Sequence, residues 1–259
     1  VKKLAERIKS CFPHIKIILG GPEVSYNASE LLSACNYIDF IISGEGEKPI
    51  AVLADALNDG TAIPDGYGIC YKSGGKIICS EPYISCEEPP SPYCDEFFAA
   101  LGNRIPYIET SRGCPYSCAF CLSGRCGGIR FFDMERTKKE ILTLAAHTSS
   151  TIKFVDRTFN ANKSRAKEIF RFICENYGKA IPEGVCCHFE IAGDILDDET
   201  IWILNNAPKG SVQLEIGMQS FNEKTLAYIN RKTDTSKLRS NITRLIAPQN
   251  IHIHIDLIT

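Results

Sequence analysis

The stretch TSRGCPYSCAFCLSGRC, residues 110 to 126, places three thiols, Cys114, Cys118 and Cys121, within eight residues and adds Cys126 five residues later. Thiolates are ligands for soft metals, and three of them on one loop can converge on one polynuclear iron–sulfur centre. A lone zinc site usually takes pairs of cysteines with C-x2-C spacing, whereas the spacing here is C-x3-C-x2-C. The loop therefore predicts an iron–sulfur cluster.

The number of thiolate ligands separates two classes of function. A four-iron cluster bound by Cys114, Cys118 and Cys121 keeps one iron open for a substrate or cofactor, which is typical of an enzyme. A fourth ligand, for which Cys126 is the candidate, would close that iron and favour an iron–sulfur electron-transfer or redox-sensing protein. We expect Cys126 to be a spare thiol and favour the enzyme.

Composition excludes several other classes. The 259 residues carry a formal net charge of -2, with acids and bases interleaved, so we expect no nucleic-acid partner and no membrane surface. The 13 cysteines are too few for a disulfide scaffold and odd in number, which favours reduced thiols. No signal peptide is recognisable and no apolar run approaches the roughly 20 residues that span a bilayer. These features predict a cytoplasmic protein.

The second part of the chain, residues 105–259, alternates strands with helices. Strands are expected at YIETS, TIKFVD, VCCHFEI, SVQLEIG and IHIHIDLI, with helices near residues 134–147, 162–177, 197–206 and 222–246. This α/β alternation predicts a parallel sheet that curves toward a barrel, here an incomplete one. An open doubly wound sheet is the alternative, because half a barrel and half a sheet give similar patterns.

The first part, residues 1–60, predicts half of a doubly wound, Rossmann-like sheet. Its strands IKIILGG and FIISGEGE end in Gly20, Gly21, Gly44 and Gly46, which either admit a ligand close to the backbone or only form tight turns. Residues 61–104 are interpreted as a hairpin and a proline-rich linker at the domain boundary. The chain starts without Met and stops in a strand, so we expect a fragment truncated at both ends.

The cysteine loop carries a resemblance to a known family. RGCPYSCAFC, with aromatic Phe120 just before the third cysteine, resembles the signature loop of radical S-adenosylmethionine (SAM) enzymes. The resemblance implies a [4Fe–4S] cluster on the three cysteines and a SAM molecule bound at the open iron, with Phe120 beside it. It also implies reductive cleavage of SAM to a 5′-deoxyadenosyl radical, driven by an external reductant such as ferredoxin or flavodoxin.

A second stretch supports the same family. LEIGMQSFNEKTLAYINR followed by HIHIDLIT resembles the branch that includes oxygen-independent coproporphyrinogen dehydrogenase and the methylthiotransferases. By this resemblance Gln219 and Asp256 would bind the ribose hydroxyls of SAM, Arg231 its carboxylate and Glu190 its amino group. For Arg231 the alternative is a cation that complements the end of a helix.

The expected strands provide an independent test of these roles. Five residues fall at the carboxyl ends of successive strands, the edge at which parallel barrels build active sites: Cys114, Asp156, Glu190, Gln219 and Asp256. In FVDRTFN, a ligand-binding role and a role in loop structure stay open for Asp156, Arg157 and Asn160.

The first sixty residues resemble the second half of the cobalamin-binding domain that precedes many radical SAM modules. By this resemblance Gly20, Gly21, Gly44 and Gly46 would line the nucleotide tail of the corrinoid. The first half of that domain, with its Asp-x-His-x-x-Gly loop, is absent from this sequence. We therefore expect cobalamin in the full-length protein, serving methyl transfer or a related radical modification. The substrate, a small molecule or another species, is not specified by the sequence.

Overall fold

The computed structural model describes residues 1–123, 128–148 and 150–258. The chain divides into two compact units, Val1–Pro90 and Ser91–Thr259. Cys126 lies outside the described residues, so its assignment as a spare thiol stays a prediction. Within the described ranges no helix is both long enough and apolar enough to cross a bilayer.

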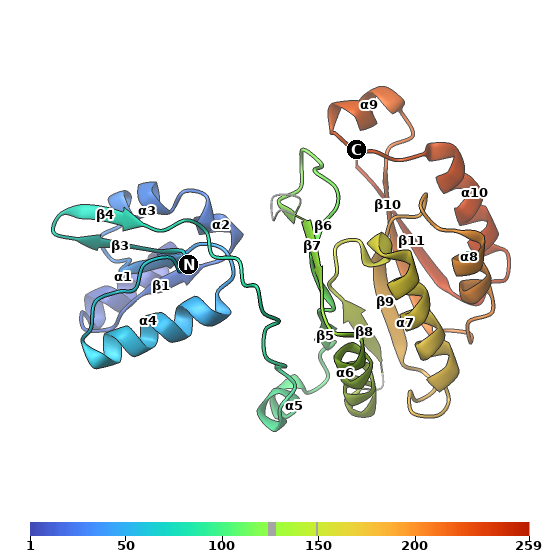
Figure 1. Cartoon of the computed structure of the whole chain (residues 1–259), viewed down its shortest axis with the longest axis horizontal. Coiled ribbons are helices and arrows are strands. Elements are labelled where there is room, and N and C mark those ends of the chain that lie inside the picture. Colours follow the sequence, from blue (N-terminus) through green and yellow to red (C-terminus); the bar gives the residue numbers. More distant parts are fainter. Residues whose placement is uncertain (124–127, 149, 259) are drawn as a thin grey trace. The chain divides into compact units, whose positions relative to one another are not determined.

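The first unit is a four-stranded sheet with the order β1-β2-β3-β4. β1 (Ile18–Gly20) and β2 (Phe40–Ile42) are parallel, whereas β3 (Ile69–Ser73) and β4 (Lys76–Cys79) continue the sheet in antiparallel fashion. The helices of this unit are α1 (Lys2–Cys11), α2 (Pro22–Ser25), α3 (Ala28–Ala34) and α4 (Glu47–Asp59) (Figure 1).

The expected hairpin is present, but it belongs to the first unit. Its two-residue turn is Gly74–Gly75, both at positive φ, and Ser73 pairs with Lys76. Three residues of β3 pair with β2, and Ile69 and Cys70, on opposite faces of the strand, enter two separate apolar cores. The linker between the units is therefore shorter than residues 61–104, and the first unit extends to Pro90.

The second unit contains a five-stranded, all-parallel sheet. Its strands are β5 (Tyr107–Ile108), β8 (Thr151–Phe154), β9 (Cys186–Ile191), β10 (Val212–Gln219) and β11 (His252–Leu257). Their spatial order follows their order in the chain. In a doubly wound sheet the spatial order of the strands reverses at a switch point, whereas in a barrel it does not. The sheet is thus a segment of a barrel-type fold.

Helices α6 (Met134–His147), α7 (Lys163–Asn176), α8 (Asp198–Asn205) and α10 (Thr235–Ile246) lie along one face of this sheet (Figure 1). The described residues of this unit also form α5 (Asp95–Leu101), α9 (Glu223–Tyr228) and the 3₁₀ helix η2 (Phe159–Ala161). The expected helix at 222–246 is two helices, because Asn230 adopts φ 52° between α9 and α10. Asp234 then caps α10 by accepting a hydrogen bond from the Lys237 amide.

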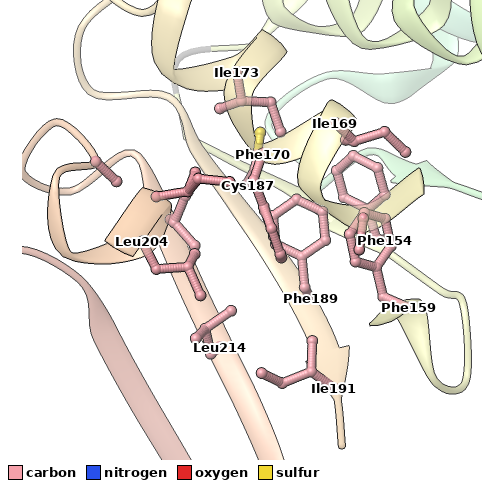
Figure 2. Close-up of a cluster of buried hydrophobic side chains, with 14 of the residues drawn as sticks. Phe154, Phe159, Ile169, Phe170, Ile173, Cys187, Phe189, Ile191, Leu204 and Leu214 are labelled. Carbon is pink, nitrogen blue, oxygen red and sulfur yellow. The ribbon is translucent and has the colours of Figure 1, made fainter. Parts of the chain in front are cut away.

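The core between sheet and helices is aromatic at its centre (Figure 2). The ring of Phe189 on β9 lies 4.2 Å from that of Phe154 on β8 and 4.4 Å from that of Phe159, centroid to centroid. Phe170 of α7 meets Phe189 at 5.1 Å. All four rings are buried, and aromatic side chains bury large apolar areas that dominate core energetics. This packing fixes the strands whose carboxyl ends build the site.

Candidate active site

The cysteine loop is carried by a hairpin that sequence reasoning missed. β6 (Ser111–Cys114) and β7 (Gly128–Phe131) are antiparallel, and Cys114 pairs with Gly128. Gly113 has φ 101°, and a Cβ atom there would lie 1.9 Å from the carbonyl oxygen of Gly128. Only glycine fits this close approach. The hairpin thereby fixes the backbone of the first cysteine.

Asp156 supports the base of this hairpin and is not among the residues that line the cavity described below. Its buried carboxylate accepts hydrogen bonds from the Thr110 amide (3.1 Å), the Thr110 hydroxyl (2.8 Å) and the Ser111 hydroxyl (2.5 Å). Burial raises the pKa of Asp156, and the bonds from Ser111 and Thr110 oppose that rise. Of the two roles left open by the sequence, ligand binding and loop structure, these bonds favour loop structure for Asp156.

Asn160 is structural in the same way, while Arg157 is not. The Asn160 side chain donates to the Ala192 carbonyl (2.7 Å) and accepts from the Ala192 amide (2.8 Å), which ties η2 to the chain after β9. Arg157 lines the cavity described below, with Nη1 3.9 Å from the Glu190 carboxylate.

The tip of the cysteine loop is anchored to the chain after α9. The Asn230 amide group donates to the Ser117 carbonyl (2.9 Å) and to the Ser117 hydroxyl (2.8 Å), and the Ala119 amide donates to the Ile229 carbonyl (2.9 Å). Asparagine tolerates the left-handed conformation of residue 230 better than most residues. Two segments that are distant in sequence therefore hold one another in place.

Arg231 lies between this loop and β10. Its guanidinium donates to the Gly217 carbonyl (3.0 Å) and the Thr233 hydroxyl (3.2 Å), and Nη1 is 3.7 Å from the sulfur of Cys118. The same group stacks over Tyr116, 5.0 Å from the ring centroid. Arg231 follows α9 by three residues, its backbone amide donates to the Leu226 carbonyl of that helix (2.8 Å), and its side chain lines the cavity.

The end of β10 turns sharply at Gln219. The register with β11 shifts between Gly217 and Gln219, and Gln219 itself has φ 64°. A Cβ atom at Gly217 would lie 2.5 Å from the Gln219 amide nitrogen, so glycine leaves room for that side chain to fold back. The bulge places Gln219 in the cavity wall, as bulges next to active sites often do.

Three carboxylates lie on adjacent strands, of which sequence reasoning named only two as site residues. Glu215 is opposite Glu190 of β9, and Gly217 is opposite Asp256 of β11. The Glu215 carboxylate is 3.0 Å from His188 Nε2 and 3.5 Å from the ammonium of Lys153. The available signal for Glu215 was its place in β10, where an acidic side chain alternates with buried apolar residues.

The charges on this face set the pKa values of its carboxyls. Burial, followed by the negative charge of Glu215, raises the pKa of both Glu190 and Asp256. Burial also opposes ionisation of Glu215 itself, but Lys153 and His188 outweigh it and lower the pKa of Glu215. Glu215 is thus the carboxylate held ionised, and its two neighbours hold protons more tightly than usual.

A cavity of about 160 Å³ opens where these elements meet. A single water needs only ~10–15 Å³ of such volume, so the cavity is much larger than a site for one water. Arg157, Thr158 and Glu215 line it in addition to the residues expected from the sequence. All the residues predicted to bind the cluster or SAM are in its wall: Cys114, Cys118, Cys121, Phe120, Glu190, Gln219, Arg231 and Asp256.

The three loop thiols suit a polynuclear cluster better than one metal ion. Among the described residues, no three His, Cys, Asp or Glu side chains are arranged to hold a single ion. A four-iron cluster binds each thiolate through a different iron, so its ligands stand farther apart. Cys114, Cys118 and Cys121 line the same cavity from one loop, and Cys114 Sγ is 3.4 Å from the Thr158 hydroxyl.

Of the four predicted glycines of the first unit, Gly20 is the last residue of β1, and Gly21, Gly44 and Gly46 follow β1 and β2. Gly21 (φ 93°) precedes α2 and Gly46 precedes α4, and an added Cβ atom would meet nothing within 4 Å at either position. Gly44 (φ 91°) packs against Tyr83, whose carbonyl oxygen would be 2.2 Å from a Cβ atom. Close packing against the Tyr83 backbone is therefore enough to explain glycine at position 44, whereas Gly21 and Gly46 border open space.

With this geometry in view, the chain can be placed in a family. Residues 108–255 match the Radical SAM superfamily, which covers more than half of the chain. The chain belongs to this superfamily of enzymes, whose members use a [4Fe–4S] cluster and SAM.

Relatives agree with this placement. An uncharacterized methyltransferase of Pyrococcus horikoshii is 32% identical over 179 residues, 65% of this chain and 38% of that protein. The cobalamin-dependent radical SAM methyltransferase TokK of Streptomyces tokunonensis is 28% identical over 276 residues, 99% of this chain and 40% of that protein. The structure of the cobalamin-dependent SAM radical enzyme OxsB with aqua-cobalamin shares the fold, with a TM-score of 0.79 at 21% identity over 99% of this chain and 39% of that one. The chain thus spans about 40% of the length of these relatives.

Proposed function

We propose that this chain is the cofactor-binding part of an enzyme that cleaves SAM reductively, and that the full-length protein uses cobalamin for methyl transfer or a related radical modification. The observation that carries the proposal is that the predicted cofactor residues share one cavity. Residues selected from four separate sequence stretches, for the cluster and for SAM, line it together.

Cys114, Cys118 and Cys121 would hold the [4Fe–4S] cluster. When bound, the cluster supplies the electron that splits the sulfonium of SAM into methionine and a 5′-deoxyadenosyl radical. The hairpin clamp at Gly113 and the anchor from Asn230 to Ser117 hold the loop in place before any ligand binds. Such preorganisation reduces the entropy lost on binding.

Arg231 is the group proposed to bind the carboxylate of SAM. Its bonds to Gly217 and Thr233 fix the guanidinium plane, and Nη1 already lies at the cysteine loop. Glu190 would accept the amino group of SAM, and a cation there would favour the ionised form that burial disfavours. Gln219 and Asp256, at the ends of β10 and β11, would bind the ribose hydroxyls.

The cobalamin part of the proposal rests on the first unit and on what relatives are named for. TokK is named a cobalamin-dependent methyltransferase, and OxsB was solved with aqua-cobalamin. In the first unit, Gly21 and Gly46 leave open space at the carboxyl ends of two parallel strands, the edge at which such sheets bind ligands. We propose that this edge faces the corrinoid. The substrate would be a small molecule or another species bound outside the described residues. Ferredoxin or flavodoxin would deliver the electron.

The alternative is an iron–sulfur protein that only transfers electrons or senses redox state. Such a protein has no use for Arg231, Gln219 and Asp256 around its cluster, so their convergence on one cavity favours the enzyme. The alternative requires a fourth cluster ligand, for which Cys126 is the candidate.

Iron and product analysis of the full-length protein separates the two. After anaerobic reconstitution we expect about four irons per radical SAM site. Replacing Cys114, Cys118 or Cys121 with Ala should abolish them, and Cys126→Ala should retain them. With dithionite and SAM, the wild-type protein should form 5′-deoxyadenosine and methionine. Loss of iron in Cys126→Ala, with no change of the cluster spectrum on adding SAM, would establish the electron carrier instead.

The cobalamin proposal is tested by equilibrium dialysis of the full-length protein against hydroxocobalamin. Gly46→Val adds a side chain to open space at the start of α4, so it should preserve the fold and weaken corrinoid binding. Asp59→Val, at the other end of the same helix, is the control and should bind normally. An unaltered affinity in Gly46→Val would remove this edge from the site.

A further inference from the structure

The β3–β4 hairpin places two thiols opposite one another. Cys70 of β3 pairs with Cys79 of β4. The next pair out is Ile69 and Ser80, in which the Ser80 amide donates to the Ile69 carbonyl at 3.2 Å. Hydrogen-bonded and non-hydrogen-bonded pairs alternate along an antiparallel ladder. Cys70 and Cys79 therefore form a non-hydrogen-bonded pair, the kind in which facing side chains come closest.

The backbone spacing of such a pair permits a disulfide. Opposed Cα atoms at non-hydrogen-bonded positions are ~4.5 Å apart, and disulfides join Cα atoms ~4.4–6.8 Å apart. Because the two residues are directly opposite, both side chains lie on the same face of the sheet. Both are free thiols in this structure.

The two thiols differ in exposure in a way that suits stepwise oxidation. Cys79 is exposed on β4, the edge strand of the sheet, whereas Cys70 is buried with Leu32, Cys35 and Ile41. Burial, followed by a hydrogen bond with the Cys79 thiol, raises the pKa of Cys70 to about 12. The exposed thiol can react first and the buried one is in place to follow.

We propose that Cys70 and Cys79 form a reversible cross-strand disulfide. The deprotonated Cys79 attacks a disulfide oxidant of the glutathione disulfide class, forming a mixed disulfide and releasing one glutathione thiolate. Cys70 then loses its proton and attacks the sulfur of Cys79, which releases the second glutathione thiolate. Two protein thiols lose two electrons, glutathione disulfide gains them, and the two protons end on the released glutathiones.

The bond would act on the turn that follows β2. The Ser43 amide donates to the Gly68 carbonyl (2.8 Å), before β3, and the Tyr83 amide donates to the Ser43 carbonyl (3.0 Å), after β4. Ser43 is therefore held between the two ends of the hairpin, and a covalent link at Cys70 and Cys79 would limit how far those ends separate. This inference does not depend on the proposed function, because it concerns thiols of the first unit only.

The test equilibrates the full chain in glutathione buffers of increasing oxidising strength. The samples are quenched with acid, unfolded and alkylated so that buried thiols react, and then digested for mass spectrometry. We expect a linked Cys70–Cys79 peptide, with alkylation of both residues lost in parallel. In Cys79→Ser, Cys70 should remain alkylated throughout, whereas the control Cys86→Ser, an exposed cysteine outside the sheet, should form the link as the wild type does.

Two results would overturn the proposal. Glutathione retained on Cys79 while Cys70 stays alkylated would show that the second step does not occur. A link from Cys70 to Cys35, its neighbour in the apolar core, would show that the cross-strand partner is wrong. Because Cys79 is exposed, Cys79→Ser should fold normally, and circular dichroism of that variant verifies the comparison.

Discussion

The guanidinium of Arg231 lies 3.7 Å from the sulfur of Cys118, a residue 113 positions earlier in the chain. This contact joins the loop after α9 to the cysteine loop, and it places a fixed cation beside the proposed cluster. The same guanidinium donates to the Gly217 carbonyl through Nη2, which fixes its position while Nη1 points to Cys118.

Arg231→Ala should weaken SAM binding while leaving iron content near that of the wild type. Loss of one charge-assisted hydrogen bond costs roughly 1.5–3 kcal/mol, which is a decrease in affinity of about tenfold or more. Arg231→Lys keeps the charge but not the planar guanidinium, so its affinity for SAM should lie between those of the wild type and Arg231→Ala. Calorimetric titration of SAM into the reconstituted protein measures this, and equal affinities in all three proteins would contradict the assigned role.

Glu215→Gln should lower the pKa of Glu190 and Asp256, because the negative charge of Glu215 raises both. Their ionised forms should then persist to lower pH. The acid limb of the pH profile for SAM binding is expected to shift toward lower pH, by an amount that carboxyl NMR can measure independently. Glu183→Gln, an exposed residue away from the cavity, is the control, and a limb that moves equally in both variants would exclude the electrostatic explanation.

Asp197→Ala should destabilise the second unit by about 1 kcal/mol at neutral pH, because Asp197 caps α8. Its carboxylate accepts from the Thr200 amide (2.9 Å) and hydroxyl (2.7 Å), and Thr200, ahead of Lys167, lowers the pKa of Asp197 to about 2. Because the folded pKa lies below the unfolded one, this stability is present above about pH 4. It should be lost as the pH falls toward 2.

Melting temperatures of wild type and Asp197→Ala, compared between neutral and acid pH, should therefore converge as the pH is lowered. Asp198→Ala is the matched control, since that side chain is highly exposed and its ion pair with Arg244 contributes little. A difference between wild type and Asp197→Ala that stays constant with pH would mean that the cap does not act through its charge.

Gly113→Ala should prevent normal assembly of the cysteine loop. A Cβ atom there meets the Gly128 carbonyl at 1.9 Å, whereas a Cβ atom at Gly128, also at positive φ, meets nothing within 4 Å. Gly128→Ala thus carries only backbone strain and serves as the control. Iron content after reconstitution should fall much further in Gly113→Ala, and full iron in that variant would show that the hairpin can open without consequence.

The regular elements were predictable because their signals are local. The helix at 134–147 was expected and found with the same bounds, since its apolar positions repeat with the helical period and Asp133 caps it. The five strands of the second unit were located by short apolar or alternating runs, and the barrel-type order follows from repeated strand–helix–strand connections. Cofactor residues could be named because they resemble a family, not because any local pattern shows them facing a cavity.

What escaped prediction depends on contacts between distant polar groups. The β6–β7 hairpin has no alternation to mark it, and the break at Asn230 is set by a bond to Ser117 that no local pattern contains. Asp156 could not be separated from a ligand-binding acid until the hydroxyls of Thr110 and Ser111 were seen around it. The hydrogen bond between His188 and Glu215 on the neighbouring strand likewise has no local signal.

The cavity wall draws on chain from Cys114 to Asp256, which is most of the second unit. No fragment of that unit can therefore keep the site after the rest unfolds. A ligand in the cavity should thus stabilise the whole unit against unfolding. At a free concentration 100 times its dissociation constant, such a ligand adds about 2.7 kcal/mol to the unfolding free energy. In calorimetry, SAM should raise the melting temperature of the second unit and leave that of the first unchanged. The melting temperature of the second unit then reports how much of the site is occupied.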